Sequence, residues 1–376
     1  MRLRVCTFNE FVRRIAGKCL ACYGAGQWGE WLCEAFPEYE IEKHIAYIAD
    51  QNSELWGKAK KINGISFDIV SPDYLYANAT EDTIILISTG VAVTPQVYSQ
   101  LEARHELNDC DCYIAMNLVI FHEDYHWDRT PSVTQDFSAG SEMRIPKLIH
   151  YAWFGENLMP ELSKKCIESW RKYCPDYEII KWDLSNYDFS NNRYMRKAAE
   201  AGKWAQLSDC ARLDIVYNHG GVYFDIDVEL LKNIDELLYN NAYCGFDHTR
   251  FVNTGAGLGS VPGLPIIRNL IDEYDNIEFE SSLEAGYIYQ TKTLSRFGLK
   301  RNGGIQSVCG MTIYPCEFFV PKYFYTGKMN ITCNTFSIHH ATVSWYTDER
   351  RSNRDKREEL LREAVKNENE LVKQLI

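Results

Sequence analysis

The middle of this chain has a distinctive order of elements: a long helical stretch, a diglycine, a short aromatic strand and two aspartates. That order is compatible with few protein folds. The helical pattern covers Tyr194–Asn218 and stops at Gly220-Gly221, because glycine accepts the positive φ at which helices commonly end. Val222–Phe224 reads as a strand that leads directly into Asp225-Ile-Asp227. Alternate strand residues point to one side, so the sequence predicts that Asp225 and Asp227 share a site at a sheet edge.

The residues around these aspartates indicate what the site binds. Two carboxylates at the end of a strand suit Mg²⁺ or Mn²⁺, which keep positions open for water and phosphate oxygens. Asp209 and Arg212 lie three residues apart on the preceding helix and so share a face. Arg212 is expected to contact phosphate, and Asp209 to hold a sugar hydroxyl or orient the arginine. By itself a pair of aspartates near a turn is more often a solvated loop, and only this context favours a metal site.

Alternating helices and strands divide the chain into three predicted parts. Residues 1–140 read as a small parallel α/β module, and residues 141–347 as a second α/β domain. Within the module, Tyr113–Phe121 is predicted to be a strand. Residues 348–376 carry balanced charges with apolar residues at helical spacing, which predicts an amphipathic helix packed on the body.

The N-terminal module contains a glycine-rich turn between a strand and a helix. The pattern is GxGxxG, with an acidic residue, Asp50, beyond it; its glycines are Gly24, Gly26 and Gly29. This is the arrangement of a dinucleotide-binding loop, with the acid placed for a ribose. Trp28 and Glu30 put bulk and negative charge near the phosphate position, and the module looks short for a complete dinucleotide fold. Nucleotide binding and a scaffold role therefore both remain open.

Charge and cysteine usage exclude some classes of protein. Lys and Arg number 40 against 52 Asp and Glu, a formal net charge of −12, so nucleic-acid binding is not expected. Thirteen scattered cysteines and the missing apolar leader favour a reduced, cytoplasmic setting. The CxxC at Cys19–Cys22 has no second pair, so a zinc ribbon is not supported.

Several stretches resemble the family 32 type of glycosyltransferase with a DXD sugar-binding region, which includes capsular-polysaccharide and yeast mannosyl-transferring enzymes. The resemblance covers the second domain but not the N-terminal module. The matching stretches, in chain order, are Ile145–Gly155, Cys166–Trp170, Cys174–Ile179, Ser208–Asp227, Asn253–Gly255, and Asn334–His340 with Ser344-Trp345.

This resemblance implies a GT-A domain preceded by the Rossmann-like module. The domain would transfer a hexose from a nucleoside-diphosphate sugar with retention of the anomeric configuration, assisted by Mn²⁺ or Mg²⁺. A UDP-sugar is favoured as donor, and the acceptor would be a saccharide or lipid-linked. The implied donor-binding residues are Trp153, Phe154, Gly155, Asp225, Ser344 and Trp345. The implied catalytic residues are Asp209, Arg212 and Asn253, and the implied metal ligands are Asp225, Asp227 and one of His339 and His340, which face opposite ways on a strand.

Two other classes of function are compatible with the sequence. A transferase fold could serve as a nucleotide-sugar-binding scaffold without catalysis, although the intact aspartate pair disfavours this. The glycine loop could also belong to an NAD-dependent sugar oxidoreductase, but no Ser-Tyr-Lys constellation supports it, and NAD is not expected. The resemblance implies a role in surface polysaccharide assembly, in the cytoplasm. An acidic chain is also compatible with peripheral association with biosynthetic machinery at the inner membrane face.

Overall fold

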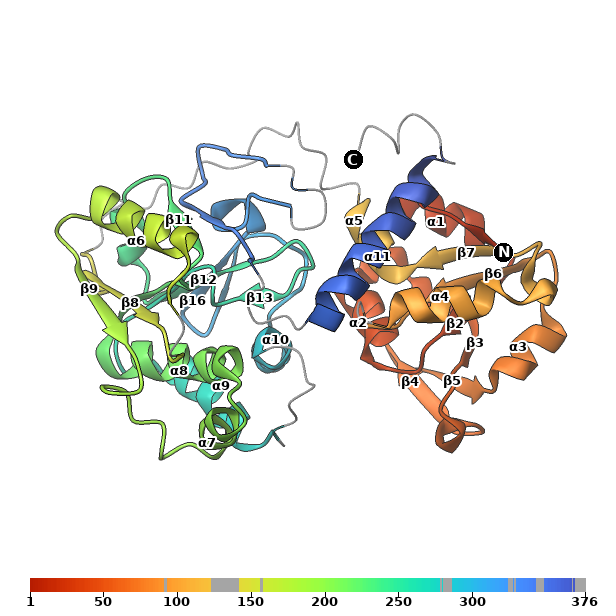
Figure 1. Cartoon of the computed structure of the whole chain (residues 1–376), viewed down its shortest axis with the longest axis horizontal. Helices are drawn as coiled ribbons and strands as arrows, with labels where there is room; N and C mark the ends of the chain where they lie inside the picture. The colour runs from red at the N-terminus through yellow and green to blue at the C-terminus, as the bar shows by residue number, and fades with distance from the viewer. Residues whose placement is uncertain are drawn as a thin grey trace. The chain divides into compact units, whose positions relative to one another are not determined.

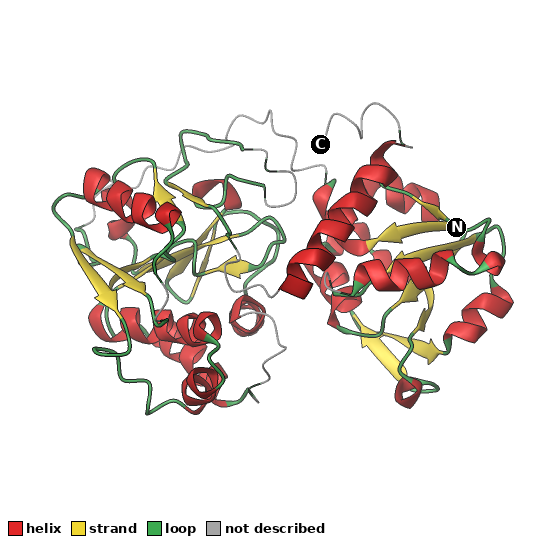
Figure 2. Cartoon of the chain, viewed as in Figure 1, coloured by secondary structure: helices red, strands yellow, loops and turns green. Residues whose placement is uncertain are grey.

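The computed structural model divides the chain into two compact units of mixed α/β structure (Figure 2). Unit 1 joins Met1–Asp128 with Ser344–Ile376, and unit 2 is Arg129–Val343. The structure describes residues 1–90, 93–122, 142–155, 158–277, 279, 286–323, 327, 329–342, 348–366 and 368. No helix in these described residues is long and apolar enough to cross a membrane.

Unit 1 is built on a seven-stranded sheet in the order β1-β7-β6-β2-β3-β5-β4. All neighbours are parallel except the β4–β5 pair. Apolar runs such as β2 are buried, as expected for parallel strands covered on both faces. The strands are β1 (Arg2–Leu3), β2 (Cys19–Tyr23), β3 (Ile45–Ala49), β4 (Ala59–Ile62), β5 (Ile65–Val70), β6 (Thr83–Ile87) and β7 (Asp111–Ile114).

The helices of unit 1 include one that the sequence pattern assigned to a strand. The prediction of a strand over Tyr113–Phe121 is wrong, because β7 ends at Ile114 and a buried helix follows at once. A short apolar run does not distinguish a buried strand from a buried helix, and the two share this one. The helices are α1 (Phe8–Ile15), α2 (Gln27–Ala35), α3 (Pro72–Asn78), α4 (Thr94–Glu102), α5 (Ala115–Ile120) and α11 (Asp348–Lys366).

The C-terminal segment returns to unit 1. Helix α11 contacts α4, beside which it lies in Figure 1, and buries Leu361, Ala364 and Val365. Beyond the helix, the buried Glu368 carboxylate lies 3.6 Å from Arg4 and 3.7 Å from Arg14. The chain thus begins and ends in the same unit.

Unit 2 contains an eight-stranded mixed sheet in the order β15-β16-β12-β14-β10-β8-β9, with β13 paired to β12, and a separate β11–β17 pair. Val222 and Tyr223 of β10 belong to different hydrophobic clusters, so the sheet is buried on both faces. The strands are β8 (Leu148–Ala152), β9 (Glu178–Trp182), β10 (Gly221–Tyr223), β11 (Val228–Leu230), β12 (Ala242–Phe246), β13 (Val252–Asn253), β14 (Leu258–Ser260), β15 (Gln306–Val308), β16 (Met311–Tyr314) and β17 (Ser337–His339).

The helical stretch that precedes β10 is two helices rather than one. The prediction of a continuous helix over Tyr194–Asn218 is wrong: the chain breaks at Gly202, which has a φ of +64°. Both flanking segments keep helical spacing, so only the glycine marks the break. The helices are α6 (Glu161–Tyr173), α7 (Arg193–Glu200), α8 (Trp204–His219), α9 (Pro265–Asp275) and α10 (Gly286–Arg296).

Candidate metal and sugar site

A tight turn after β10 carries the two aspartates. The Asp225 amide donates to the Gly255 carbonyl at 2.9 Å, and the Val228 amide donates to the Asp225 carbonyl at 3.1 Å. Strand β11 then begins at Val228 and pairs antiparallel with β17, which sets Val228 opposite His339. The turn and this register bring Asp225, Asp227 and His339 to one place.

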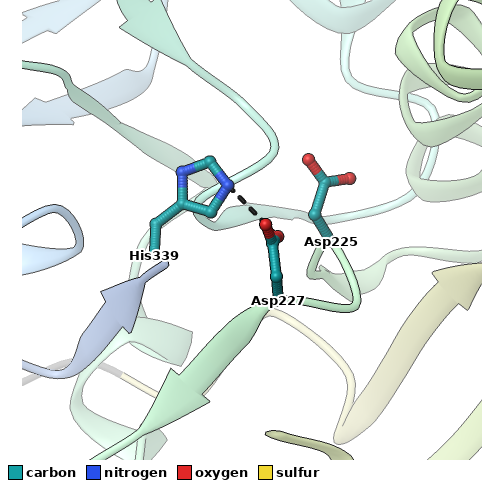
Figure 3. A group of neighbouring side chains, drawn as sticks. All are labelled: Asp225, Asp227 and His339. Carbon is teal, nitrogen blue, oxygen red and sulfur yellow. Dashed lines mark ion pairs between the residues drawn. The ribbon is translucent and has the colours of Figure 1, made fainter. Parts of the chain in front are cut away.

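Asp225, Asp227 and His339 form a three-residue cluster (Figure 3). One ligand atom from each lies within 4.8 Å of the others. The imidazole Nε2 of His339 is 3.3 Å from Oδ1 of Asp227. Two carboxylates and an imidazole fit a divalent cation such as Mn²⁺ or Mg²⁺, so these residues could hold the ion that the sequence suggested.

Asp227 is the most constrained of the three. Its Oδ2 accepts from both the amide and the hydroxyl of Thr342, each at 2.9 Å. Burial opposes the charged form, but His339 and the Thr342 donors outweigh it and hold the pKa of Asp227 well below its usual range. Burial also opposes the charge on His339, and Asp227 raises the pKa of that histidine. Cation binding would therefore displace a proton from His339.

A buried arginine joins the helix to the strand. Arg212 of α8 places Nη2 2.9 Å from Asp209 and 3.1 Å from Asp225. Its Nη1 donates to the Thr254 hydroxyl at 3.4 Å, and its guanidinium lies over the Tyr223 ring. One cation thus fixes two carboxylates relative to each other.

Asp209 is held by the start of α10 as well as by Arg212. Its Oδ2 accepts from the Gly286 amide at 3.2 Å. Burial raises the pKa of Asp209, and Arg212 opposes that rise. Gln290, itself buried, donates to the Tyr274 hydroxyl at 2.9 Å and accepts from Thr254 at 2.8 Å. The network orients a carboxylate beside the metal cluster.

Asn253 shapes the turn opposite Asp225. Its Oδ1 accepts from the amides of Gly255 and Ala256, both at 3.1 Å, and its Nδ2 lies 3.4 Å from Nδ1 of His339. Asn253 therefore acts on the geometry of the turn and on the orientation of the His339 ring.

Replacing Gly255 is expected to disrupt this site. A Cβ there would lie 2.1 Å from Oδ2 of Asp225 and 2.8 Å from Nη1 of Arg212, so either the turn or the carboxylate must move. We expect Gly255→Ala to destabilise the fold by about 1–3 kcal/mol and to weaken Mn²⁺ binding, measured by urea unfolding and calorimetry. Gly304→Ala is the matched control, because its nearest neighbour would be 3.5 Å away. Equal behaviour of the two variants would contradict the prediction.

The tryptophan loop after β8 is divided between core and surface. Trp153 is partly buried, and its amide donates to the Trp182 carbonyl at 2.8 Å. Phe154, expected to contact the donor, is instead only 2% exposed and packs against Tyr187 in the core, since alternation along the chain turns it inward. Gly155 is partly exposed. Ser344 and Trp345 lie outside the described residues.

The two adjacent histidines separate as the strand pattern predicted. His339 joins the aspartates, whereas His340 Nε2 lies 2.8 Å from a carboxylate oxygen of Glu229. Of the two histidines that the sequence left open, His339 is the one beside the aspartates, because neighbouring strand residues point to opposite sides. Gly24, Gly26, Gly29 and Asp50 all lie in unit 1: the first two follow β2, Gly29 lies in the first turn of α2, and Asp50 follows β3.

Several residues that bear on the site were missed by sequence reasoning. Thr342, Gln290 and Gly286 carry no local signal, because each acts through a partner distant in sequence. His150 of β8 had one, a polar residue inside an apolar strand. Its Nε2 lies 2.9 Å from the Gly220 carbonyl and its Nδ1 lies 3.2 Å from the Trp182 indole nitrogen. A neutral ring satisfies both and stabilises the turn that leads into β10.

The titration of His150 is expected to appear in the pH dependence of stability. Burial lowers the pKa of His150 from 6.5 to about 4, so the unfolded chain binds a proton before the folded one does. This contribution to stability is complete above pH 6.5 and is lost toward pH 4, by up to about 3 kcal/mol. His150→Gln retains an N–H donor without titrating, so its unfolding free energy should fall less over this window. Exposed His105→Gln is the control, and parallel profiles for His150→Gln and wild type would refute the prediction.

A family model matches the part of the chain that contains these residues, and several known proteins are similar to the chain. The family model for the glycosyltransferase sugar-binding region containing a DXD motif matches residues 160–243. Inositol phosphoceramide mannosyltransferase 1 of Schizosaccharomyces pombe is 36% identical over 114 residues, 28% of this chain and 35% of that protein. Subversion of eukaryotic traffic protein A of Legionella pneumophila subsp. pneumophila is 27% identical over 117 residues, 24% of this chain and 18% of that protein.

A solved structure, that of the PaToxG glycosyltransferase, aligns over 40% of this chain and 68% of that chain, with a TM-score of 0.35 and 21% identity. The chain spans about a third of the length of the mannosyltransferases it matches. The matched region includes Asp209, Arg212 and both aspartates after β10. Residues 160–243 of this chain therefore match the DXD-containing sugar-binding region of glycosyltransferases.

Proposed function

We propose that unit 2 is a metal-dependent glycosyltransferase domain that moves a hexose from a nucleoside-diphosphate sugar, with a UDP-sugar favoured, to a saccharide or lipid-linked acceptor. The observation that carries the proposal is the Asp225, Asp227 and His339 cluster, within 4.8 Å, beside the Asp209–Arg212 pair. A metal site next to a buried, charge-paired carboxylate is what a sugar diphosphate requires.

The roles of the residues follow from their contacts. Asp227 and His339 would hold the cation, which when bound would neutralise negative charge developing on the departing diphosphate. Arg212, held between Asp209 and Asp225, orients both carboxylates. Asp209 would accept a sugar hydroxyl, and Asn253 would keep the His339 ring in place.

Retention is proposed to proceed by attack on the face that the diphosphate leaves. The acceptor oxygen bonds to the anomeric carbon as the bond from that carbon to the diphosphate oxygen breaks, and the hydroxyl proton passes to the leaving phosphate. This route is motivated by the carboxylates present: Asp209 and Asp225 are paired with Arg212, and Asp227 with His339. A glycosyl adduct on any of them, found by mass spectrometry, would refute it.

The proposed biological setting is the assembly of a surface glycan or glycolipid. The sequence resemblance favours surface polysaccharide assembly in the cytoplasm, at the inner membrane face. The names of the Schizosaccharomyces pombe relatives refer to a lipid acceptor, inositol phosphoceramide. Acceptors of both kinds, oligosaccharide and glycolipid, therefore belong in the first assays.

The test is release of nucleoside diphosphate from a panel of UDP- and GDP-sugars, with Mn²⁺ and with EDTA. We expect Mn²⁺-dependent turnover of one donor, stimulated by an acceptor. Calorimetric binding without turnover across the acceptor panel would favour a non-catalytic nucleotide-sugar-binding protein. Absorbance change of a nicotinamide cofactor would favour an oxidoreductase, and neither binding nor turnover would refute the proposal.

A further inference from the structure

The glycine loop of unit 1 is not used by the proposed transferase chemistry, and its three glycines play three different parts. Gly24 has a φ of +114°, and a Cβ there would lie 2.8 Å from Thr89. A Cβ on Gly29 would meet the Ser88 side chain at 3.3 Å, so this glycine lets α2 pack closely on the end of β6. Gly26 has neither constraint, since no atom lies within 4 Å of its Cβ position. Its lack of a side chain leaves open space before the first amides of α2.

The loop lies where open α/β sheets bind ligands. Strand β2 has β3 on one side and β6 on the other, so the chain order reverses at β2 (Figure 1). Ligands of such sheets bind beyond the carboxyl ends of the strands at this reversal. The strands in the order β5-β3-β2-β6-β7-β1 are all parallel, so the module is more complete than its sequence suggested.

Asp50 stands at the end of β3, ready to accept hydroxyl groups. Among the described residues, two backbone amides hold its carboxylate: Ala25 donates to Oδ2 at 2.7 Å and Asn52 donates to Oδ1 at 2.8 Å. Each oxygen retains a lone pair for a ribose hydroxyl. Trp56, 42% exposed, donates its indole N–H to the Asp50 carbonyl at 2.7 Å, which sets an aromatic face beside the carboxylate for a base.

A buried hydroxyl also lies at the base of the loop. Tyr23, the last residue of β2, is 2% exposed, and its hydroxyl makes no hydrogen bond of acceptable geometry in the described chain. Burial, with smaller contributions from its neighbours, Asp50 among them, raises the pKa of Tyr23 to about 12. The hydroxyl therefore remains protonated, and it lies near Asp50. The Gln51 and Tyr76 side chains also lie beside this hydroxyl.

The sequence alone suggested that the negative charge of Glu30 opposes phosphate binding, but a lysine balances that charge. Lys60 of β4 lies 3.4 Å from a Glu30 carboxylate oxygen and donates to the carbonyls of Ala25 and Gly26 at 3.0 and 2.9 Å. The lysine thus brings a cation to the loop itself.

Trp28 restricts the size of the ligand. The Cβ position of Gly90, after β6, is 3.1 Å from the Trp28 indole nitrogen, so this side chain reaches from the glycine loop to the β6 loop. In a dinucleotide site the second nucleotide lies across that crevice. The indole leaves room for one nucleotide rather than two.

We infer that the loop formed by Gly24, Gly26 and Gly29, with Asp50 and Trp56, is a second binding site, for a nucleoside diphosphate with an unmodified ribose. The diphosphate lies at Gly26 and the first amides of α2, the ribose hydroxyls at Asp50, and the base against Trp56. The site is complete within unit 1 and does not depend on the proposed transferase activity.

The test uses the full chain carrying Asp225→Asn and Asp227→Asn, in EDTA, so that the metal cluster contributes little. Calorimetry with ADP, UDP and GDP is expected to show binding of at least one at one site per chain. Gly26→Val should weaken it at least about tenfold, because its side chain meets phosphate but no protein atom. Exposed Ala77→Val is the matched control. Asp50→Asn, and the 2′-deoxy form of the nucleotide, should each weaken binding severalfold.

A comparison of NAD⁺ with a nucleoside diphosphate tests whether the site accepts one nucleotide or two. NAD⁺ should bind at least about tenfold more weakly than the nucleoside diphosphate, and Trp28→Ala should narrow that difference. NAD⁺ bound as tightly as the diphosphate would overturn the limit to one nucleotide. The site itself is overturned if no nucleotide binds at millimolar concentration, or if Gly26→Val binds as well as the Ala77→Val control.

Discussion

Asp227→Asn should lower donor turnover by at least about 100-fold. Both carboxylate oxygens of Asp227 are held: Thr342 donates twice to one oxygen, and His339 faces the other at 3.3 Å. Asparagine keeps the shape and one oxygen but removes the charge that binds a cation. Turnover should therefore recover in part as the Mn²⁺ concentration is raised, and a Mn²⁺ titration of the diphosphate-release rate measures this.

The matched control for that variant is Asp183→Asn, at the end of β9. Asp183 is partly exposed, and in the described part of the chain its carboxylate bonds to Ser185 and Lys181, so its substitution should leave the Mn²⁺ titration unchanged. Wild-type turnover by Asp227→Asn at every Mn²⁺ concentration would separate the cluster from the reaction.

Arg212→Met is expected to have the largest effect on stability. Arg212 is buried and places one nitrogen 2.9 Å from Asp209 and 3.1 Å from Asp225. Methionine fills much of the volume but leaves two carboxylates without their cation. Breaking a buried pair in this way costs about 3–5 kcal/mol. Urea unfolding at pH 7 measures the loss.

The pH dependence of that loss distinguishes charge from packing. Burial raises the pKa of Asp209 even with Arg212 present, so without the arginine this carboxyl takes up a proton more readily. The cost of Arg212→Met should then shrink as the pH falls toward 4. Arg268→Met removes a half-exposed partner of Asp272 and should cost no more than about 0.5 kcal/mol. A large loss that is independent of pH would mean that packing, not charge, stabilises this site.

Helix-and-strand alternation was predicted well wherever a pattern repeats along the chain. Strand β10 lies within one residue of the predicted Val222–Phe224, and α11 lies in the segment predicted to be an amphipathic helix, because burial of one face leaves a periodic trace in the sequence. The breaks were harder. Gly202 divides two helices that have the same spacing on either side, and the run after Tyr113 is apolar in a way that both a strand and a helix satisfy.

The sequence alone determined that Asp225 and Asp227 face one site, and that at most one of two adjacent histidines could join them. Both follow from the two-residue period of extended chain, a local property. Tertiary structure decided the rest. The register of β11 with β17 places His339 beside the aspartates and His340 beside Glu229. In the folded chain Phe154 packs in the core, and Thr342 donates to Asp227. These contacts join residues that are far apart in the chain. The local spacing of residues in the sequence does not indicate which distant residues the fold brings together.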